Sequence, residues 1–152
     1  MISPKKLGHS ALLTCQVAEE VNFAANGITA EGIKAFDGIL QSNITLKVLN
    51  LSGNSIGDEG AKVLCDILVD NSGIQKLQLN STNIGDEGAK AIAELLKKNS
   101  TLRTIDLNNN LIDYSGFSGL AKALLENKSL NSLYLKGPQP DEATSGPFCP
   151  PD

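Results

Sequence analysis

Apolar positions along the chain follow two alternating spacings. From Leu46 to Ile56 the apolar residues recur as L-x-x-L-x-L-x-x-N-x-I, and alternation over a few residues predicts a short strand with one buried side. After Gly60 the apolar residues fall three or four positions apart, which predicts an amphipathic helix. One unit of the chain is therefore a strand followed by a helix.

This strand–helix unit recurs with a period of 28 residues. A fixed period of this size is typical of solenoid proteins, in which each unit packs against its neighbours. Helices are wider than the strand spacing of about 4.8 Å, so a stack of such units must curve. We therefore expect an α/β solenoid shaped as a horseshoe segment, with a parallel sheet on the concave face and helices on the convex face. The complete copies cover 46–71, 74–99 and 102–127, with a degenerate copy over 18–43 and a fifth strand from Leu130.

The expected organisation has three parts. Residues 1–17 form either a partial repeat or a disordered segment, residues 18–136 form four full units and a final strand, and residues 137–152 form a disordered tail. The tail holds five of the six prolines, and Pro138 stands where the other units carry Asn or Thr. Neither end carries a polar capping unit, so the chain is expected to be an excerpt of a longer array or to self-associate through its uncapped sheet edges.

Two further columns of residues, and a pair of aspartates, recur at the ends of the predicted helices. An Asn follows each helical face and is expected to end the helix in the left-handed conformation. Asp58 and Asp86 are expected to cap the N-termini of their own helices. A Gly stands near each helix start, where close packing against a neighbour is expected. The columns are Asn43, Asn71, Asn99, Asn127 and Gly32, Gly60, Gly88, Gly116.

Composition narrows the classes of partner and the cell compartment. The formal net charge is −4 with one arginine among thirteen basic residues, which argues against nucleic-acid binding, and no apolar run is long enough to predict a membrane span. Cys15, Cys65 and Cys149 lack metal-ligand spacing and predict free thiols in the cytoplasm, with Cys65 in the core and Cys149 reactive. The first eighteen residues lack acidic side chains, which leaves organellar import as an alternative.

Catalytic chemistry has no evident centre in this sequence. His9 is the only histidine and lies in the N-terminal segment, so a His-based triad is not predicted. The stretch Asp106 to Asn110 begins like a calcium loop, but Leu111 and Phe117 stand where such a loop needs Gly and Glu. We therefore predict no metal, no cofactor and no enzyme activity.

The 28-residue pattern L-x-x-L-x-L-x-x-N-x-I-x-x-x-G resembles the leucine-rich repeats of the ribonuclease-inhibitor class, and NxIGDEGAKxL is similar to the repeats of NOD-like receptors. The resemblance covers residues 18–136. It implies that a structural column, Asn26, Asn54 and Asn110, hydrogen-bonds the turn backbone, and that Thr82 loses one donor there. It also leaves two alternatives open: a GTPase-activating regulator of the Ran-activator type, and a fragment of a NOD-like receptor.

The alternate strand positions predict a polar platform on the concave face, which would bind another protein of unidentified nature. Tyr134 is the expected anchor, because aromatic residues dominate interface energetics. The candidate partner-binding residues are Glu20, Asn22, Val48, Asn50, Lys76, Gln78, Asn80, Thr104, Asp106, Asn108, Tyr134 and Lys136.

Overall fold

The computed structural model describes residues 9–137. The predictions made for residues 1–8 and 138–152, among them the disordered tail and the reactive Cys149, lie outside these residues. The strands are β1 (Glu20–Asn22), β2 (Val48–Asn50), β3 (Lys76–Gln78), β4 (Thr104–Asp106) and β5 (Ser132–Tyr134). The helices are α1 (His9–Val17), α2 (Ala30–Ile33) with the short 3-10 helix η1 (Lys34–Phe36), α3 (Gly57–Leu68), α4 (Asp86–Lys98) and α5 (Tyr114–Glu126).

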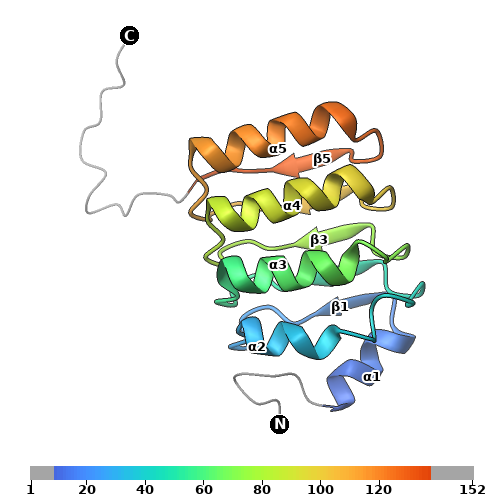
Figure 1. The fold of residues 1–152 in the computed structure, drawn as a ribbon. Helices are drawn as coiled ribbons and strands as arrows, with labels where there is room; N and C mark the ends of the chain where they lie inside the picture. Colours follow the sequence, from blue (N-terminus) through green and yellow to red (C-terminus); the bar gives the residue numbers. More distant parts are fainter. Residues whose placement is uncertain (1–8, 138–152) are drawn as a thin grey trace.

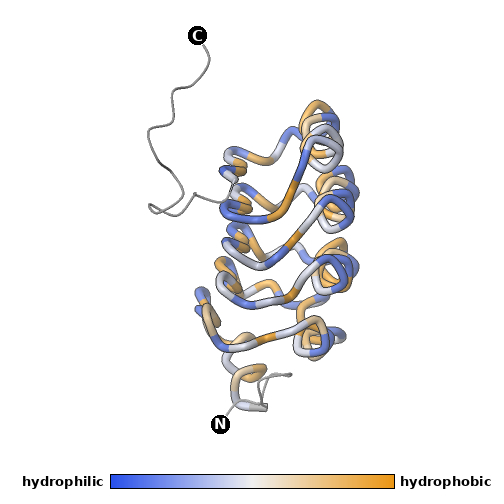
Figure 2. The backbone as a smooth tube through the Cα atoms, turned by 90° about the vertical axis from the view of Figure 1, so that its left-hand side faces the viewer, coloured by the Kyte–Doolittle hydropathy of each residue, from blue (hydrophilic) through white to orange (hydrophobic). Residues whose placement is uncertain are grey.

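The strands form one parallel sheet in the order β1-β2-β3-β4-β5. Each strand residue pairs with the residue 28 positions later, so that Glu20 pairs with Val48 and Val48 with Lys76. The helices lie side by side along one face of the sheet (Figures 1 and 2). The predicted α/β leucine-rich-repeat solenoid is therefore confirmed, and its repeat length is the register of its sheet.

The core lies between the sheet and the helices. The middle residue of each of the first four strands points into it and is buried, as are the leucine and isoleucine positions that flank the strands. Leu64 and Leu68 of α3 face these side chains from the helix layer, and Ile92 and Leu96 do so from α4. The buried strand residues are Val21, Leu49, Leu77 and Ile105.

The first unit departs from the others. Its helical segment is split into α2 and η1, and Asp37 then turns to an extended conformation before Gly38, whose φ is +79°. Phe36 fills the space beneath this segment, with its ring centroid 6.2 Å from that of Phe23. Before it, α1 runs in the repeat register, because Asn43 donates from Nδ2 to the carbonyl of Cys15 at 2.8 Å, 28 residues earlier.

The asparagines after the helices do not end them in the left-handed conformation, so that expectation was wrong. Asn99 and Asn127 have φ values of −91° and −81°. Their side chains instead bridge neighbouring units: Asn99 Nδ2 donates to the carbonyls of Leu68 and Asn71, and its Oδ1 accepts the N–H of Leu102. Each of these amides therefore joins two neighbouring units of the array.

The expected capping by Asp58 and Asp86 is also corrected. Neither caps its own helix: Asp58 lies within α3 and Asp86 is the first residue of α4. Asp58 Oδ1 accepts the N–H groups of Gly85 and Gly88 at the start of the next helix. Asp86 does the same for α5. Each carboxylate therefore satisfies the free N–H groups of the following unit.

Candidate functional site: the concave face

The face of the sheet turned away from the helices is not covered by any other part of residues 9–137. Its outward strand positions are exposed or half-buried in all five strands, whereas the inward positions of the first four are buried. Figure 2 shows the strands and helices as two separate layers. Helix spacing of 8–10 Å against strand spacing of about 4.8 Å places this face on the concave side.

Several of the predicted contact residues hold the ends of the strands. Asn22, Asn50 and Asp106 each accept the backbone N–H two residues later, at 2.9–3.0 Å. Asp106 also accepts a hydrogen bond from Asn80 Nδ2 at 2.7 Å. These side chains close the turn after each strand, a role that spacing alone did not suggest.

The outward positions just after the strands, Ser52, Asn80, Asn108 and Lys136, link each unit to the next. Ser52 Oγ accepts the backbone N–H of Asn80 at 3.0 Å, and Asn108 Oδ1 accepts that of Lys136 at 2.6 Å. Asn80 and Asn108 are therefore part of the strand-end network as well as of the concave surface. A ligand that engaged their amides would have to replace these internal bonds.

The remaining candidates make no side-chain hydrogen bond or ion pair with another residue in the described part of the chain. They are half-buried or exposed, and Tyr134 on β5 is 50% exposed. Because their polar groups are not engaged within the protein, they can meet a partner without breaking an internal bond. These residues are Glu20, Val48, Lys76, Gln78, Thr104, Tyr134 and Lys136.

The structural asparagines lie beneath this surface. Asn110 is buried; its Oδ1 accepts the N–H groups of Thr82 and Ile84, and its Nδ2 donates to the carbonyls of Leu79 and Leu107. Asn54 makes the equivalent bonds to Asn26, Ile28 and Phe23 of the first unit and to Leu51 of its own unit.

The column is interrupted at two positions. Asn26 is exposed, and its side chain donates only to the carbonyl of Ala24. Thr82 has one hydroxyl donor, which reaches the carbonyl of Leu79 in its own unit. Gly57, the first residue of α3, donates its N–H to the Thr82 carbonyl and has a φ of +64°.

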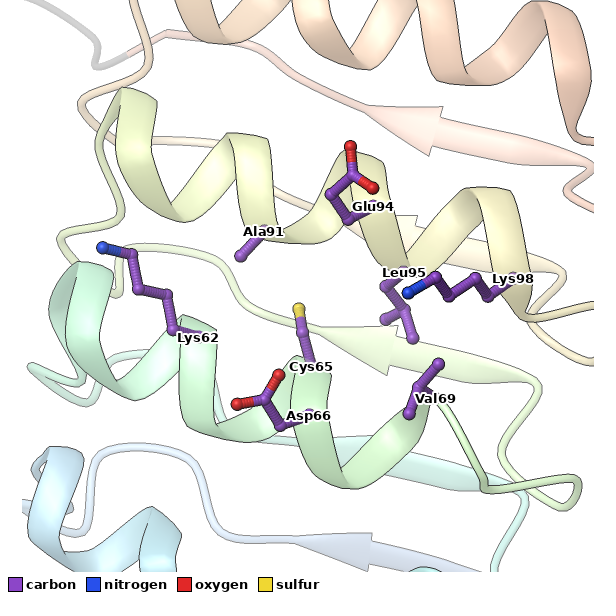
Figure 3. Close-up of a pocket in the computed structure, with 8 residues that line it drawn as sticks. All are labelled: Lys62, Cys65, Asp66, Val69, Ala91, Glu94, Leu95 and Lys98. Atoms are coloured by element: carbon purple, nitrogen blue, oxygen red, sulfur yellow. The ribbon is translucent and has the colours of Figure 1, made fainter.

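A groove of about 330 Å³ lies on the opposite, convex side between α3 and α4 (Figure 3). Lys62 and Lys98 line it together with Asp66 and Glu94, so its charges balance. The thiol of Cys65 points toward it from α3, and burial raises the pKa of this thiol to about 12. The thiol is therefore protonated and unreactive at neutral pH.

Two searches of residues 9–137 bear on other kinds of site. Within them, no cluster of three or more His, Cys, Asp or Glu side chains is arranged to hold a metal ion. None of the helices in this part of the chain has the length and apolar character needed to cross a membrane.

Comparisons with known proteins agree with this geometry. The family model of the leucine-rich repeat matches residues 42–65, 70–93 and 98–121. A search of curated protein sequences found no match. The solved structure of leiomodin-1 actin-binding site 2 is similar with a TM-score of 0.77 and 27% identity, over 83% of this chain and 77% of that chain.

A second solved structure, the tropomodulin C-terminal domain of Caenorhabditis elegans, has a TM-score of 0.54 and 16% identity, over 85% of this chain and 64% of that chain. This likeness shows the fold alone. The ribonuclease-inhibitor class of the repeat stays a prediction. The chain belongs to the leucine-rich repeat proteins. This follows from the matches to the repeat model, together with the buried asparagines that join the units and the similarity to the leiomodin-1 structure.

Proposed function

We propose that the chain is a non-enzymatic protein-interaction module that binds its partner on the concave face. The observation that supports this most directly is the sheet face left uncovered by residues 9–137, since parallel sheets usually have both faces covered. Five of the seven side chains that make no internal bond fall into two groups. Lys76, Gln78 and Thr104 lie on the two adjacent central strands, with Tyr134 and Lys136 toward the C-terminal edge.

The partner is expected to be bound by polar and aromatic contacts rather than by a deep pocket. Lys76 offers a cation and Tyr134 an aromatic ring with a hydroxyl, both of which are suited to a polar protein surface. Five strands about 4.8 Å apart give a platform roughly 20 Å wide. The interface is therefore expected to fall below the ~800 Å² per partner of a standard complex, and the affinity to be modest.

Actin is the first partner to test. The supporting observation is the similarity to leiomodin-1 actin-binding site 2, which extends over most of both chains. Actin binding would also agree with the cytoplasmic location expected from the unpaired cysteines. We extend to this chain only the partner, and the residues proposed to meet it are those on its own concave face.

Co-sedimentation with actin filaments and native gel shift with monomeric actin test this proposal. The variant carries Lys76→Glu and Tyr134→Ala, which change two exposed side chains that bond to no other described residue. Its control carries Lys62→Glu on α3 and Leu13→Ala on α1, the same kinds of change away from the concave face. We expect wild type and control to bind, and the variant to bind at least about tenfold more weakly.

The outcomes separate the two parts of the proposal. Equal binding by variant and wild type would exclude the concave face as the actin site. If neither form of actin is bound, actin is excluded as the partner. Acceleration of GTP hydrolysis by Ran-type GTPases would instead support the regulatory alternative.

A further inference from the structure

Helix α5 carries a stripe of apolar side chains that no other described residue covers. We define the α5 stripe as Tyr114, Phe117, Ala121, Leu124 and Leu125, which share one side of the helix because they are spaced by three, four, three and one residues. Tyr114 is 83% exposed, Phe117 55%, Leu124 38% and Leu125 84%. In Figure 1 this helix is the last of the layer, and its outer side faces away from α4.

The stripe is more apolar than its place at the end of the array requires. Two of its positions are charged in α4, where Asp86 and Lys97 occupy the places of Tyr114 and Leu125. Helix α4 contains six charged residues, whereas α5 contains only Lys122 and Glu126, and neither of these belongs to the stripe. An exposed apolar patch of this kind marks an interaction surface.

Another repeat could not cover the stripe at the spacing of this array. Successive helices approach so closely that a Cβ built on Gly116 would lie 3.0 Å from the Cβ of Ala89. Phe117 stands at the place of Ala89 and would fill that space. Tyr114 stands at the place of Asp86, so the carboxylate that receives the N–H groups of a following helix is missing.

The neighbouring edge of the sheet is open on the same side. In the inner strands Leu79 donates its N–H to the carbonyl of Asp106, and Leu107 donates to that of Tyr134. The corresponding N–H of Leu135 has no acceptor among residues 9–137. The carbonyl of Arg103 accepts two N–H groups from the β5 segment, and that of Asn131, its counterpart, accepts none. An occupant of this end must therefore satisfy a strand edge as well as the α5 stripe.

We propose that the occupant is a second copy of this chain, related by a two-fold axis perpendicular to the sheet. Such an axis places β5 antiparallel to β5 of the second copy and α5 antiparallel to its α5 on the same face of the joined sheet. One copy therefore covers both open surfaces, whereas an isolated helix or strand covers only one. The stripe holds no charge, so the contact brings no like charges together despite the net charge of −4 on each chain.

The symmetry fixes which side chains meet. A two-fold axis that passes beside α5, level with the midpoint between Leu120 and Ala121, sets Phe117 of each copy opposite Leu124 of the other. The larger interhelical distance that Phe117 imposes is within the 8–10 Å of ordinary helix pairs. This contact uses the α5 stripe and the backbone edge of β5 rather than the Tyr134 side chain on the concave face, so it can form with or without the partner proposed above.

Analytical ultracentrifugation of the full chain from micromolar to millimolar concentration tests the proposal. We expect wild type to approach twice the chain mass of 16.0 kDa as its concentration rises. Phe117→Glu and Leu124→Lys should each raise the dimer dissociation constant about thirtyfold or more, as expected for loss of an interface hot spot. Ile44→Glu changes an apolar residue that is 67% exposed far from α5 and should leave dimerisation unaltered.

Mixing the Phe117→Glu and Leu124→Lys variants provides the most specific test of the proposed contact. In a mixed dimer the new Glu at position 117 of one copy faces the new Lys at position 124 of the other. The second contact keeps Phe117 against Leu124, so the mixture should dimerise more tightly than either variant alone. A monomer at every wild-type concentration would overturn the proposal. It would also be overturned if both variants dimerised normally or if the mixture stayed monomeric. Circular dichroism melts of each variant show that an altered mass does not come from unfolding.

Discussion

Asp58 Oδ1 lies 2.9 Å from the backbone nitrogen of Gly88, so a carboxylate in one helix caps the start of the next. The same oxygen accepts the N–H of Gly85 at 2.7 Å. The glycine is needed at this point, because a Cβ on residue 88 would come within 2.7 Å of that oxygen. The Gly column and the Asp column are thus two halves of one inter-unit contact, repeated by Asp86 and Gly116.

Replacement of Asp58 is expected to destabilise α4 rather than α3. Asp58→Ala leaves two N–H groups at the start of α4 without their acceptor, and loss of a helix cap costs about 1–2 kcal/mol. Urea denaturation measures the loss in the free energy of unfolding, and hydrogen exchange shows which helix is destabilised. Faster exchange of the first-turn amides of α4 is expected, whereas an effect confined to α3 would contradict the inter-unit cap.

Gly88→Ala tests the other side of this contact. The added methyl meets Asp58 Oδ1, Ile84 and Ala61, so we expect a loss of about 1–3 kcal/mol in the free energy of unfolding. The loss should be smaller in an Asp58→Ala background, because the carboxylate is then gone.

Gly119 is the matched control for Gly88. A Cβ there has no neighbour within 4 Å, and the residue lies in the middle of α5. Gly119→Ala should therefore raise stability by about 0.5–1 kcal/mol. A loss of stability at position 119 would show that the array does not tolerate any added methyl, and that the Asp58 contact is not the cause.

Equivalent asparagines should differ in their contribution to stability. Asn110→Ala removes an amide that bonds five backbone groups, and leaves buried groups unsatisfied at a cost of about 3 kcal/mol or more. Asn26→Ala removes a single exposed bond and should cost less than about 0.5 kcal/mol. Chemical denaturation of both variants measures the difference, and equal losses would contradict the bridging role.

Stability is expected to fall at alkaline pH because of the buried thiols. Burial raises the pKa of Cys65 from 9.0 to about 12 and that of Cys15 to about 11. An unfolded thiol ionises first as the pH rises above 9.0, so the contribution of each buried thiol is complete below that pH and is lost on the way to its folded pKa.

Cys65→Ala isolates this effect, since the next unit carries Ala93 at the same position. Between about pH 8 and about pH 10.5 wild type should lose about 2 kcal/mol more than the variant, because each unit of pKa difference is worth about 1.4 kcal/mol. Urea denaturation at both pH values measures this difference in the free energy of unfolding. An identical pH dependence in both proteins would show that the thiol stays protonated in the unfolded chain or ionises in the folded one.

The repeated spacing was enough to predict the architecture. A period of 28 residues sets the strand pairing directly, because Val48, Lys76 and Thr104 are neighbours in the sheet for the same reason that they are equivalent in the sequence. The apolar faces of the helices and the buried leucines follow from the same 28-residue period. The first unit was harder, since Gly38 and Asp37 interrupt its helix in a pattern that no other copy shows.

The concave face could be predicted only as a set of positions. Alternation identified Asn22, Asn50 and Asp106 as outward-facing, but all three are engaged with the backbone at the strand ends. A side chain that turns back onto its own chain has the same place in the pattern as one that faces a ligand. The distinction depends on rotamers and distances, which a one-dimensional pattern does not contain.

The sequence by itself determined the repeat, the parallel sheet and the side of each strand that is buried, because each of these depends on local spacing that recurs. The tertiary structure decided that Asp58 serves the helix after its own, and which polar side chains stay free. It also decided that the α5 stripe is exposed among the described residues. These depend on contacts between residues about 28 positions apart, where the separation of two packed helices determines which atoms meet.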